Sequence, residues 1–242
     1  MHRLLVESVL LDEESPVLPA DAARHLKVLR PKDGEAIELF DGCGSWRTYA
    51  WDSSASRLRA QSNNQTIKQS NISLTLFACV TKGSRWDWTI EKATELGVTR
   101  IVPVISERTI VRIPKGERAA KRERWMRIAE DAARQSDAKW LPEIHEAVDF
   151  KDALPLVKET TCFIGALTNP PSPPLLLAGK RSNNQANKRF SVFIGPEGDF
   201  TPEELKVLME IATPTSFGPT ILRAETAAIY AVSVLAATLT SV

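Results

Sequence analysis

Two loops that each contain a Gly-Pro pair hold the residues of this sequence best suited to binding and chemistry. The first, residues 195–198 (Gly-Pro-Glu-Gly), follows an apolar, β-branched run and precedes a helix start with Thr201 as N-cap and Pro202 at the first helical position. Unpaired N–H groups at a helix N-terminus, and glycines without a Cβ, let a ligand approach the main chain closely. The loop predicts a ligand site, although an ordinary capped connection between a strand and a helix fits the loop equally well.

The second loop, residues 217–226, has a similar arrangement. A strand end runs into Gly218 and Pro219, and after an apolar pair the charged residues Arg223 and Glu225 open an apolar helix. Two such loops at neighbouring strand ends can lie side by side and share one ligand. An isolated Arg and Glu at these positions would more simply cap the helix and form an ion pair with each other on the surface.

A third feature is a basic segment. Residues 108–127 contain eight Lys or Arg and two Glu, on a predicted loop and the helix that follows it. This clustering suits contacts with nucleic-acid phosphates, although a charge run is more often a solvated face. If the N-terminal region also binds RNA, it does so through a few placed cations. The expected RNA contacts are Arg3, Lys27, Arg30, Arg108, Arg112, Arg118, Arg122 and Arg124.

The composition of the whole chain excludes several classes of protein. The 242 residues carry a net charge of +1, with three Cys, three His and no C-x-x-C pair. This predicts neither a disulfide framework nor a metal site, and it fits a reducing cytoplasm. No P-loop, no G-x-G-x-x-G pattern and no secretory signal is found. Residues 226–242 carry no charge but include five Ser or Thr, so we expect a helix buried in a core or an interface and no membrane span.

The elements that must position these residues fall into two regions. Residues 1–70 show short alternating runs separated by Gly-containing turns, which predicts a small β-rich domain with one helix over residues 20–29. The polar residues 61–71 indicate a linker. After it, strands alternate with helices, which predicts an α/β domain over residues 71–242 with a mostly parallel sheet covered on both faces. Ligands bind such sheets at the carboxyl ends of the strands, where both Gly-Pro loops are expected.

The hydrophobic pattern also sets the expected bounds of these elements. In the first region, strands are expected over residues 3–9, 35–39, 46–51 and 57–61. In the second region, strands are expected over residues 73–81, 100–105, 161–167, 191–194 and 215–217. Helices are expected there over residues 87–96 and 117–135, and from residues 202 and 224.

Several short motifs, in order along the whole chain, resemble those of one enzyme family. They are Leu39-Phe40-Asp41-Gly42, Lys82-Gly83-Ser84-Arg85, Ser106-Glu107-Arg108, Gly195-Pro196-Glu197-Gly198 and Ile221-Leu222-Arg223-Ala224-Glu225-Thr226-Ala227. With these motifs the chain is similar to the small-subunit (16S) ribosomal RNA uracil-N3 methyltransferases, often called RsmE, of the SPOUT superfamily.

The resemblance implies a C-terminal SPOUT domain with a deep trefoil knot and a PUA-like, RNA-binding N-terminal domain. It implies a homodimer whose site is completed across the interface, and S-adenosylmethionine as cofactor. The implied activity is methylation of N3 of a uridine, in the ribosomal RNA or in the assembled 30S subunit, by a cytoplasmic enzyme. Carried over by position, the cofactor residues are Leu167, Ile194, Gly195, Pro196, Glu197, Gly198, Phe217, Gly218, Ile221, Leu222 and Arg223.

Three charged residues receive roles in this reaction. N3 of uracil carries an imide proton, so methyl transfer requires removal of that proton and stabilisation of negative charge on the flanking carbonyl oxygens. We expect Arg223 to supply the positive charge. We expect Glu197 or Glu225 to help remove the proton or to orient the arginine.

The sequence departs from the family pattern at three positions. Asp199, Thr220 and Ala224 stand where the family usually has Gly, Arg and Thr. Two other functions are therefore kept open. One is a non-catalytic RNA-binding or ribosome-assembly protein with the same fold, which would not bind S-adenosylmethionine. The other is an α/β enzyme that binds a nucleotide or phosphate of a small molecule, whose activity would not depend on the basic segment.

Overall fold

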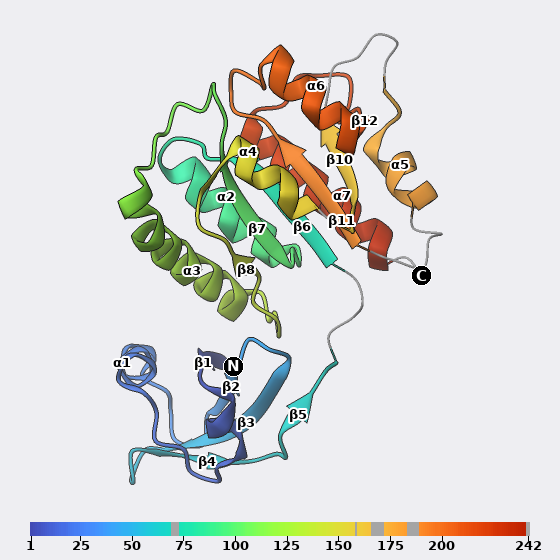
Figure 1. The fold of residues 1–242 in the computed structure, drawn as a ribbon. Helices are drawn as coiled ribbons and strands as arrows, with labels where there is room; N and C mark the ends of the chain where they lie inside the picture. Colours follow the sequence, from blue (N-terminus) through green and yellow to red (C-terminus); the bar gives the residue numbers. More distant parts are fainter. Residues whose placement is uncertain (69–72, 158, 166–171, 183–188, 241–242) are drawn as a thin grey trace. The chain divides into compact units, whose positions relative to one another are not determined.

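The computed structural model describes residues 1–68, 73–157, 159–165, 172–182 and 189–240. Contacts between residues divide the chain into two compact units, whose elements are drawn in Figure 1. Unit 1 comprises Met1–Gln69 and Glu130–Leu141, and unit 2 comprises Ser70–Ala129 and Pro142–Val242. Residues 130–141 thus belong with the N-terminal residues, whereas the predicted domain ranges, 1–70 and 71–242, place them in the second domain.

Unit 1 is built on a five-stranded sheet in the order β1-β2-β3-β4, with β5 paired to β3. β1 pairs with β2 in parallel, and the other pairs are antiparallel. The strands are β1 (His2–Leu5), β2 (Ala36–Phe40), β3 (Ser45–Asp52), β4 (Arg57–Ala60) and β5 (Gln65–Thr66). The helix α1 (Ala20–Leu29) has the predicted bounds. β5 lies in the segment predicted to be a linker, of which residues 69–71 are outside the described residues.

The first predicted strand is shorter than expected. β1 ends at Leu5, and a 3-10 helix, η1 (Ser8–Asp12), occupies the rest of the apolar run. Val9 is exposed and Leu11 is completely buried. An extended strand would put both side chains on the same face, whereas a helical turn brings Leu11 into the core and leaves Val9 in solvent.

A buried cluster of charges ties residues 130–141 to the sheet of unit 1. Arg3 is only 8% exposed, and its Nε donates a hydrogen bond to Glu38 Oε1 at 2.7 Å. Lys139 Nζ donates to both carboxylate oxygens of Glu38 at 2.7 and 2.9 Å, and Arg3 also donates to the carbonyl of Ala133 at 2.6 Å. These contacts satisfy charges that would be costly to bury alone. Arg3 is therefore a structural residue, which corrects its assignment as an RNA contact.

Unit 2 contains a seven-stranded sheet in which every pair is parallel, in the order β12-β10-β11-β6-β7-β8, with β9 also paired to β7. The strands are β6 (Ser73–Cys79), β7 (Arg100–Ile105), β8 (Glu143–Ile144), β9 (Val148–Asp149), β10 (Thr161–Gly165), β11 (Arg189–Ile194) and β12 (Thr213–Thr215). The predicted parallel α/β sheet is confirmed. Because all these strands run the same way, their carboxyl ends lie along one edge.

Helices pack on both faces of this sheet. They are α2 (Ser84–Glu95), α3 (Arg118–Gln135), α4 (Phe150–Ala153), α5 (Leu175–Ser182), α6 (Pro202–Ile211) and α7 (Ala224–Thr240), with single 3-10 turns η2 (Lys115–Glu117) and η3 (Leu154–Val157). Leu76 of β6 belongs to a buried cluster with residues of α2, α3, α5 and α7, whereas the next residue, Phe77, belongs to a second cluster with residues of α4 and α6. This alternation explains why the central strands are apolar throughout.

The uncharged C-terminal helix α7 packs within the first of these clusters. Ala228, Ala231, Val232 and Leu235 are all nearly or completely buried, and α7 packs against α2, α5 and β6. Within the described part of the chain, no helix is long and apolar enough to cross a membrane. The start of α7 follows the second Gly-Pro loop, so its burial in the core fixes one end of that loop.

Candidate active site

A cavity of about 340 Å³ lies where the two Gly-Pro loops leave the sheet of unit 2. This volume is within the range of roughly 300–1,000 Å³ that is usual for small-molecule sites. The wall is formed by the ends of β10, β11 and β12, by both loops and by the start of α7. The lining residues are Gly165, Phe193, Ile194, Gly195, Pro196, Glu197, Asp199, Thr215, Ser216, Phe217, Gly218, Thr220, Ile221, Leu222, Arg223, Ala224 and Ala227.

The first loop is held in one conformation by hydrogen bonds at its end. Thr201 Oγ1 accepts from the N–H of Glu204 at 3.2 Å, and Glu204 Oε2 accepts from the N–H of Thr201 at 3.1 Å, which makes a capping box around the predicted N-cap. Within the loop, the N–H of Asp199 donates to the carbonyl of Pro196 at 2.9 Å. Phe200 and Thr201 are buried beneath the loop. These internal bonds therefore fix the conformation of the loop at this end.

Asp199 takes the left-handed backbone conformation that glycine adopts most easily, with φ of 59°. Its Oδ1 accepts a hydrogen bond from the N–H of Phe200 at 2.7 Å, and the same oxygen lies 3.1 Å from where a Cβ would stand on Gly195. Short polar side chains tolerate this conformation because they can bond the local main chain. The departure from the family's glycine is therefore accommodated, and it adds a carboxylate to the lining.

The second loop is less constrained. Gly218 has a φ of 127°, which a residue with a Cβ adopts only with strain. Ile221 is 85% exposed, and Arg223 is exposed too. The ring of Phe217 covers Gly165, since a Cβ on that glycine would lie 2.6 Å from the ring. Gly165 is thus required for Phe217 to close the floor of the cavity.

The three charged candidates differ in their surroundings. Arg223 lines the cavity, and no hydrogen bond or ion pair of its guanidinium is recorded with any described residue. Glu197 also lines the cavity and pairs with Arg85 of α2 at 3.4 Å. Glu225 is 9% exposed and is not among the lining residues, and its Oε2 is buried without a partner in the described part of the structure.

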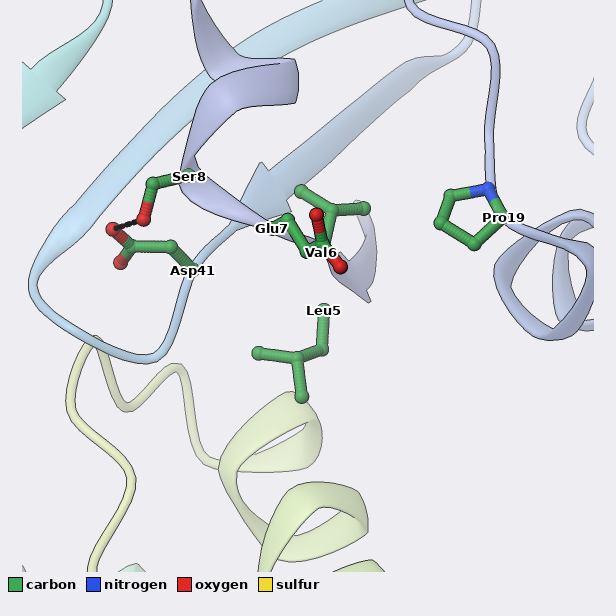
Figure 2. Close-up of a pocket in the computed structure, with 6 residues that line it drawn as sticks. All are labelled: Leu5, Val6, Glu7, Ser8, Pro19 and Asp41. Carbon is green, nitrogen blue, oxygen red and sulfur yellow. Dashed lines mark hydrogen bonds between the residues drawn. The ribbon is translucent and has the colours of Figure 1, made fainter.

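A second cavity, of about 530 Å³, lies in unit 1 and is shown in Figure 2. It is lined by Leu5, Val6, Glu7, Ser8, Pro19 and Asp41. Ser8 Oγ donates to Asp41 Oδ2 at 2.9 Å, the bond that is dashed in the figure. Both charged groups are carboxylates, which repel phosphate, and none of the predicted site residues lies there. We therefore assign the active site to the cavity of unit 2.

Comparisons with known proteins show the family of this chain. Residues 68–236 match the model of the RNA methyltransferase domain family. A ribosomal RNA small subunit methyltransferase E from a Synechocystis species is 31% identical over 99% of this chain and 78% of its own length. The chain belongs to the ribosomal RNA small subunit methyltransferase E family.

Solved structures of other methyltransferases show that the similarity of this methyltransferase extends to its fold. A ribosomal RNA small subunit methyltransferase E from Neisseria gonorrhoeae, bound to S-adenosyl methionine, is 30% identical, with a TM-score of 0.80 over 96% of this chain and 95% of the other. A methyltransferase from Legionella pneumophila in complex with the cofactor SAM is 27% identical, with a TM-score of 0.76 over 98% and 96% of the two chains.

Most of the cofactor residues expected for this methyltransferase come together in the cavity. Ile194, Gly195, Pro196, Glu197, Phe217, Gly218, Ile221, Leu222 and Arg223 all line it. Gly198 lies in the first loop but not in the lining, and Leu167 lies outside the described residues. The sequence interpretation missed Gly165. A glycine at the end of the apolar strand run 161–165 was the available signal, because glycine in a strand often marks a close approach.

The arginines expected to contact RNA are mostly used inside unit 2. Arg108 and Arg112 donate to main-chain carbonyls of the first Gly-Pro loop and of residues 106–107, respectively. Arg118 pairs with Asp149 at 2.6 Å, Arg122 donates to the carbonyl of Ile144 at 2.7 Å, and Arg124 pairs with Asp87. In unit 1, Lys27 and Arg30 are exposed, and no side-chain partner is recorded for them among the described residues.

The two buried cysteines of the methyltransferase, and the potential metal ligands among its described residues, offer no second reaction site. Burial raises the pKa of the Cys79 thiol to about 11, so the thiol stays protonated at neutral pH. The Cys162 pKa is also raised to about 11 by burial. Among the residues that the structure describes, no group of three or more His, Cys, Asp or Glu is arranged to hold a metal ion.

Proposed function

We propose that this protein transfers a methyl group from S-adenosylmethionine to N3 of a uridine in small-subunit ribosomal RNA. The observation that carries the proposal is the cavity between the two Gly-Pro loops, which brings Arg223 and Glu197 into one lining at the carboxyl edge of a parallel sheet. The family of the chain and the cofactor held by its structural relatives support the same reaction.

The residues of the cavity fit S-adenosylmethionine. Ile194, Phe217, Ile221 and Leu222 offer apolar contact to a purine ring. Three N–H groups of the loops, those of Glu197, Ile221 and Leu222, have no acceptor recorded among the described residues, and such groups can bond the edge of a base. The carboxylates of Glu197 and Asp199 lie in the same lining and suit a cationic ligand.

The charged residues then have distinct roles. When bound, the cofactor supplies an electrophilic methyl group. Glu197 lines the cavity, so it is the better placed of the two glutamates to accept the N3 proton of uracil. Arg223 stabilises the negative charge that this proton loss leaves on the carbonyl oxygens flanking N3. Glu225 lies buried in the first turn of α7, two residues after Arg223, and would orient that arginine only if the exposed Arg223 side chain turns toward its carboxylate, whose Oε2 has no partner among the described residues, when substrate binds.

The two glutamate roles can be separated by kinetics. Replacement Glu197→Gln removes the proposed proton acceptor, so turnover should fall by about 10²–10⁴-fold and the pH dependence of kcat should lose its acidic limb. Replacement Glu225→Gln keeps the shape of the side chain and should retain that limb with a smaller loss. If the two variants showed the opposite pattern, the roles would be exchanged.

We extend the proposal to the features that family membership implies for the architecture. Unit 1 forms a PUA-like RNA-binding domain, and unit 2 forms a SPOUT domain whose C-terminal loops are knotted. Two copies associate as a cytoplasmic homodimer, and the partner completes the site. Lys27 and Arg30 contact RNA from unit 1, because both are exposed and no internal partner is recorded for them in the described part of unit 1. Arg118, Arg122 and Arg124 contribute to RNA affinity through the guanidinium N–H groups that their internal hydrogen bonds do not use.

Calorimetric titration with S-adenosylmethionine, followed by transfer of its labelled methyl group, tests the proposal. Purified 30S subunits and deproteinised 16S RNA, both from a strain lacking the activity, serve as alternative substrates. We expect saturable binding of the cofactor and labelling of at least one of these RNAs. RNA binding without saturable cofactor binding would instead support a non-catalytic assembly protein. Cofactor binding with no label in either RNA would point to a small-molecule substrate.

A further inference from the structure

The loop that follows β7, residues 106–112, has a rigid internal structure. Ser106 and Thr109 are 2% and 1% exposed, and their hydroxyl oxygens lie 2.9 Å apart. The N–H of Ser106 donates to Thr109 Oγ1 at 3.0 Å. Arg112 donates to the carbonyl of Ser106 at 3.0 Å and to the carbonyl of Glu107 at 2.6 Å. We name these residues the β7 loop. Its shape is fixed by its own bonds, so it can serve as a support for a neighbour.

The neighbour that it supports is the first Gly-Pro loop. Arg108 donates from one terminal nitrogen to the carbonyls of Gly198 at 3.0 Å and of Phe200 at 3.4 Å. From the other side, the N–H of Glu107 donates to Glu204 Oε1 at 2.9 Å. Since the second carboxylate oxygen of Glu204 caps α6, one side chain joins the helix cap to the β7 loop. Three hydrogen bonds between residues 90 to 97 positions apart in sequence therefore fasten this loop.

The positions of these bonds matter for the cavity. Gly198 and Phe200 flank Asp199, which lines the cavity and has a strained left-handed conformation. A charged donor that bridges the two flanking carbonyls holds that conformation better than a neutral donor, because charge-assisted hydrogen bonds are about twice as strong as neutral ones. Without the bridge, the loop could relax and move Glu197 and Asp199 out of the lining.

We propose that Arg108 is a positioning residue for the cofactor pocket, which holds the main chain of the first Gly-Pro loop in the form that binds S-adenosylmethionine. This role replaces the RNA contact expected from the sequence, and it rests on the proposed cofactor site. Glu204 supports the same loop through the N–H of Glu107. The pocket thus depends on a side chain from the β7 loop, which does not line it.

The variants Arg108→Ala and Arg108→Lys test this role. Arg24→Ala is the matched control, because Arg24 is an exposed arginine of α1 whose recorded partner is Asp21 on the same helix. The first measurement is hydrogen exchange of residues 195–200 in the ligand-free protein. We expect faster exchange in Arg108→Ala than in the wild type or Arg24→Ala, because the main-chain carbonyls lose their donor.

The second measurement is the dissociation constant for S-adenosylmethionine by calorimetry, with RNA affinity measured in parallel over a range of salt concentrations. Arg108→Ala should weaken cofactor binding about tenfold, as expected for loss of a charge-assisted bond. Arg108→Lys should restore part of that loss, and RNA affinity should stay within twofold. Unchanged cofactor affinity and exchange in Arg108→Ala would overturn the positioning role. So would weaker RNA binding with a reduced salt dependence, which marks a phosphate contact. A wild-type protein that binds no S-adenosylmethionine would overturn the proposed function itself.

Discussion

The two Gly-Pro loops of unit 2 have similar sequences but are built in different ways. The first ends in a complete capping box, is followed by the buried Phe200 and receives bonds from Arg85 of α2 and from Arg108 of the β7 loop. The second, residues 216–223, has a hydrogen-bonded contact between Ser216 and Gly218 and leaves Ile221 85% exposed. One loop is fastened to the body of the unit at several points, and the other is held mainly at its two ends.

Because of this difference, the two loops have different roles in the cavity. The fastened loop presents its main chain and Glu197 in a fixed place, so it offers a preorganised half of the site. The open loop carries Arg223, which the proposed reaction needs only once the substrate is present. Part of its apolar surface is exposed, so it is the half that ligand or a second copy of the chain would cover. The predictions below test this comparison.

The largest effect is expected at the open loop. Replacement Arg223→Ala removes the positive charge proposed to stabilise the carbonyl oxygens of uracil, so turnover should fall by about 10²–10³-fold. The dissociation constant for S-adenosylmethionine should change much less, since the charge acts on the substrate. Single-turnover kinetics with saturating cofactor measures the chemical step. Unchanged single-turnover kinetics in a folded variant would contradict the role of this arginine.

A smaller effect is expected at the floor that the open loop covers. Replacement Gly165→Ala places a Cβ 2.6 Å from the ring of Phe217, which must move. Overpacking of this kind costs about 1–3 kcal/mol, so cofactor affinity should fall roughly tenfold or more. Gly116→Ala is a suitable control, because a Cβ on Gly116 meets no atom within 4 Å. Equal cofactor affinity in both variants would show that Phe217 does not close the pocket.

Ligand binding should change the hydrogen exchange of the two loops to different extents. Upon binding of S-adenosylmethionine, hydrogen exchange in residues 217–223 should slow by about tenfold, because the ligand orders an open segment. Exchange in residues 195–200 should slow by a smaller factor, because that loop is already fastened. Mass spectrometry of peptides from the free and bound protein measures both. Equal protection of the two segments would contradict the proposed difference in preorganisation.

The smallest effect is expected from the cap of the fastened loop. Replacement Thr201→Ala removes the acceptor for the N–H of Glu204 and should lower the free energy of unfolding by about 1 kcal/mol. For a chain of this size that corresponds to a fall in Tm of about 2–4 °C. Thermal unfolding followed by circular dichroism measures the change. A Tm equal to that of the wild type would mean that the capping box does not stabilise this loop.

Local sequence patterns were sufficient to predict features that depend on residues close together in the sequence. The bounds of α1 and β7 match the prediction, and the capping box at Thr201 follows from its own four residues. The parallel sheet followed from alternation of strands and helices. The helix bounds and the cap depend on interactions that span only a few positions, and the sheet could be predicted from the order of its elements along the chain.

Features that depend on distant residues were missed or misassigned. Arg3 was expected to be one of a few placed cations that bind RNA, but its carboxylate partner, Glu38, which it shares with Lys139, is set by tertiary packing. The same packing places residues 130–141 in unit 1. Arg108 was expected to contact RNA from the charge of its segment, and that charge gave no sign of its internal acceptors, which lie 90 and 92 positions away. Charge density alone does not distinguish a phosphate contact from an internal bond.

In the proposed reaction, the fastened and the open loop together form the site at which a methyl group is transferred to N3 of a uridine. The most direct test maps the modified atom after the purified protein and S-adenosylmethionine react with 30S subunits or 16S RNA from a strain lacking the activity. We predict one uridine at which reverse transcription stops, because a methyl group on N3 blocks base pairing, and N3-methyluridine among the digested nucleosides. The Arg223→Ala variant should give neither at comparable times. Labelled RNA without a stop at a uridine, or a methyl group on another base or on ribose, would contradict the account.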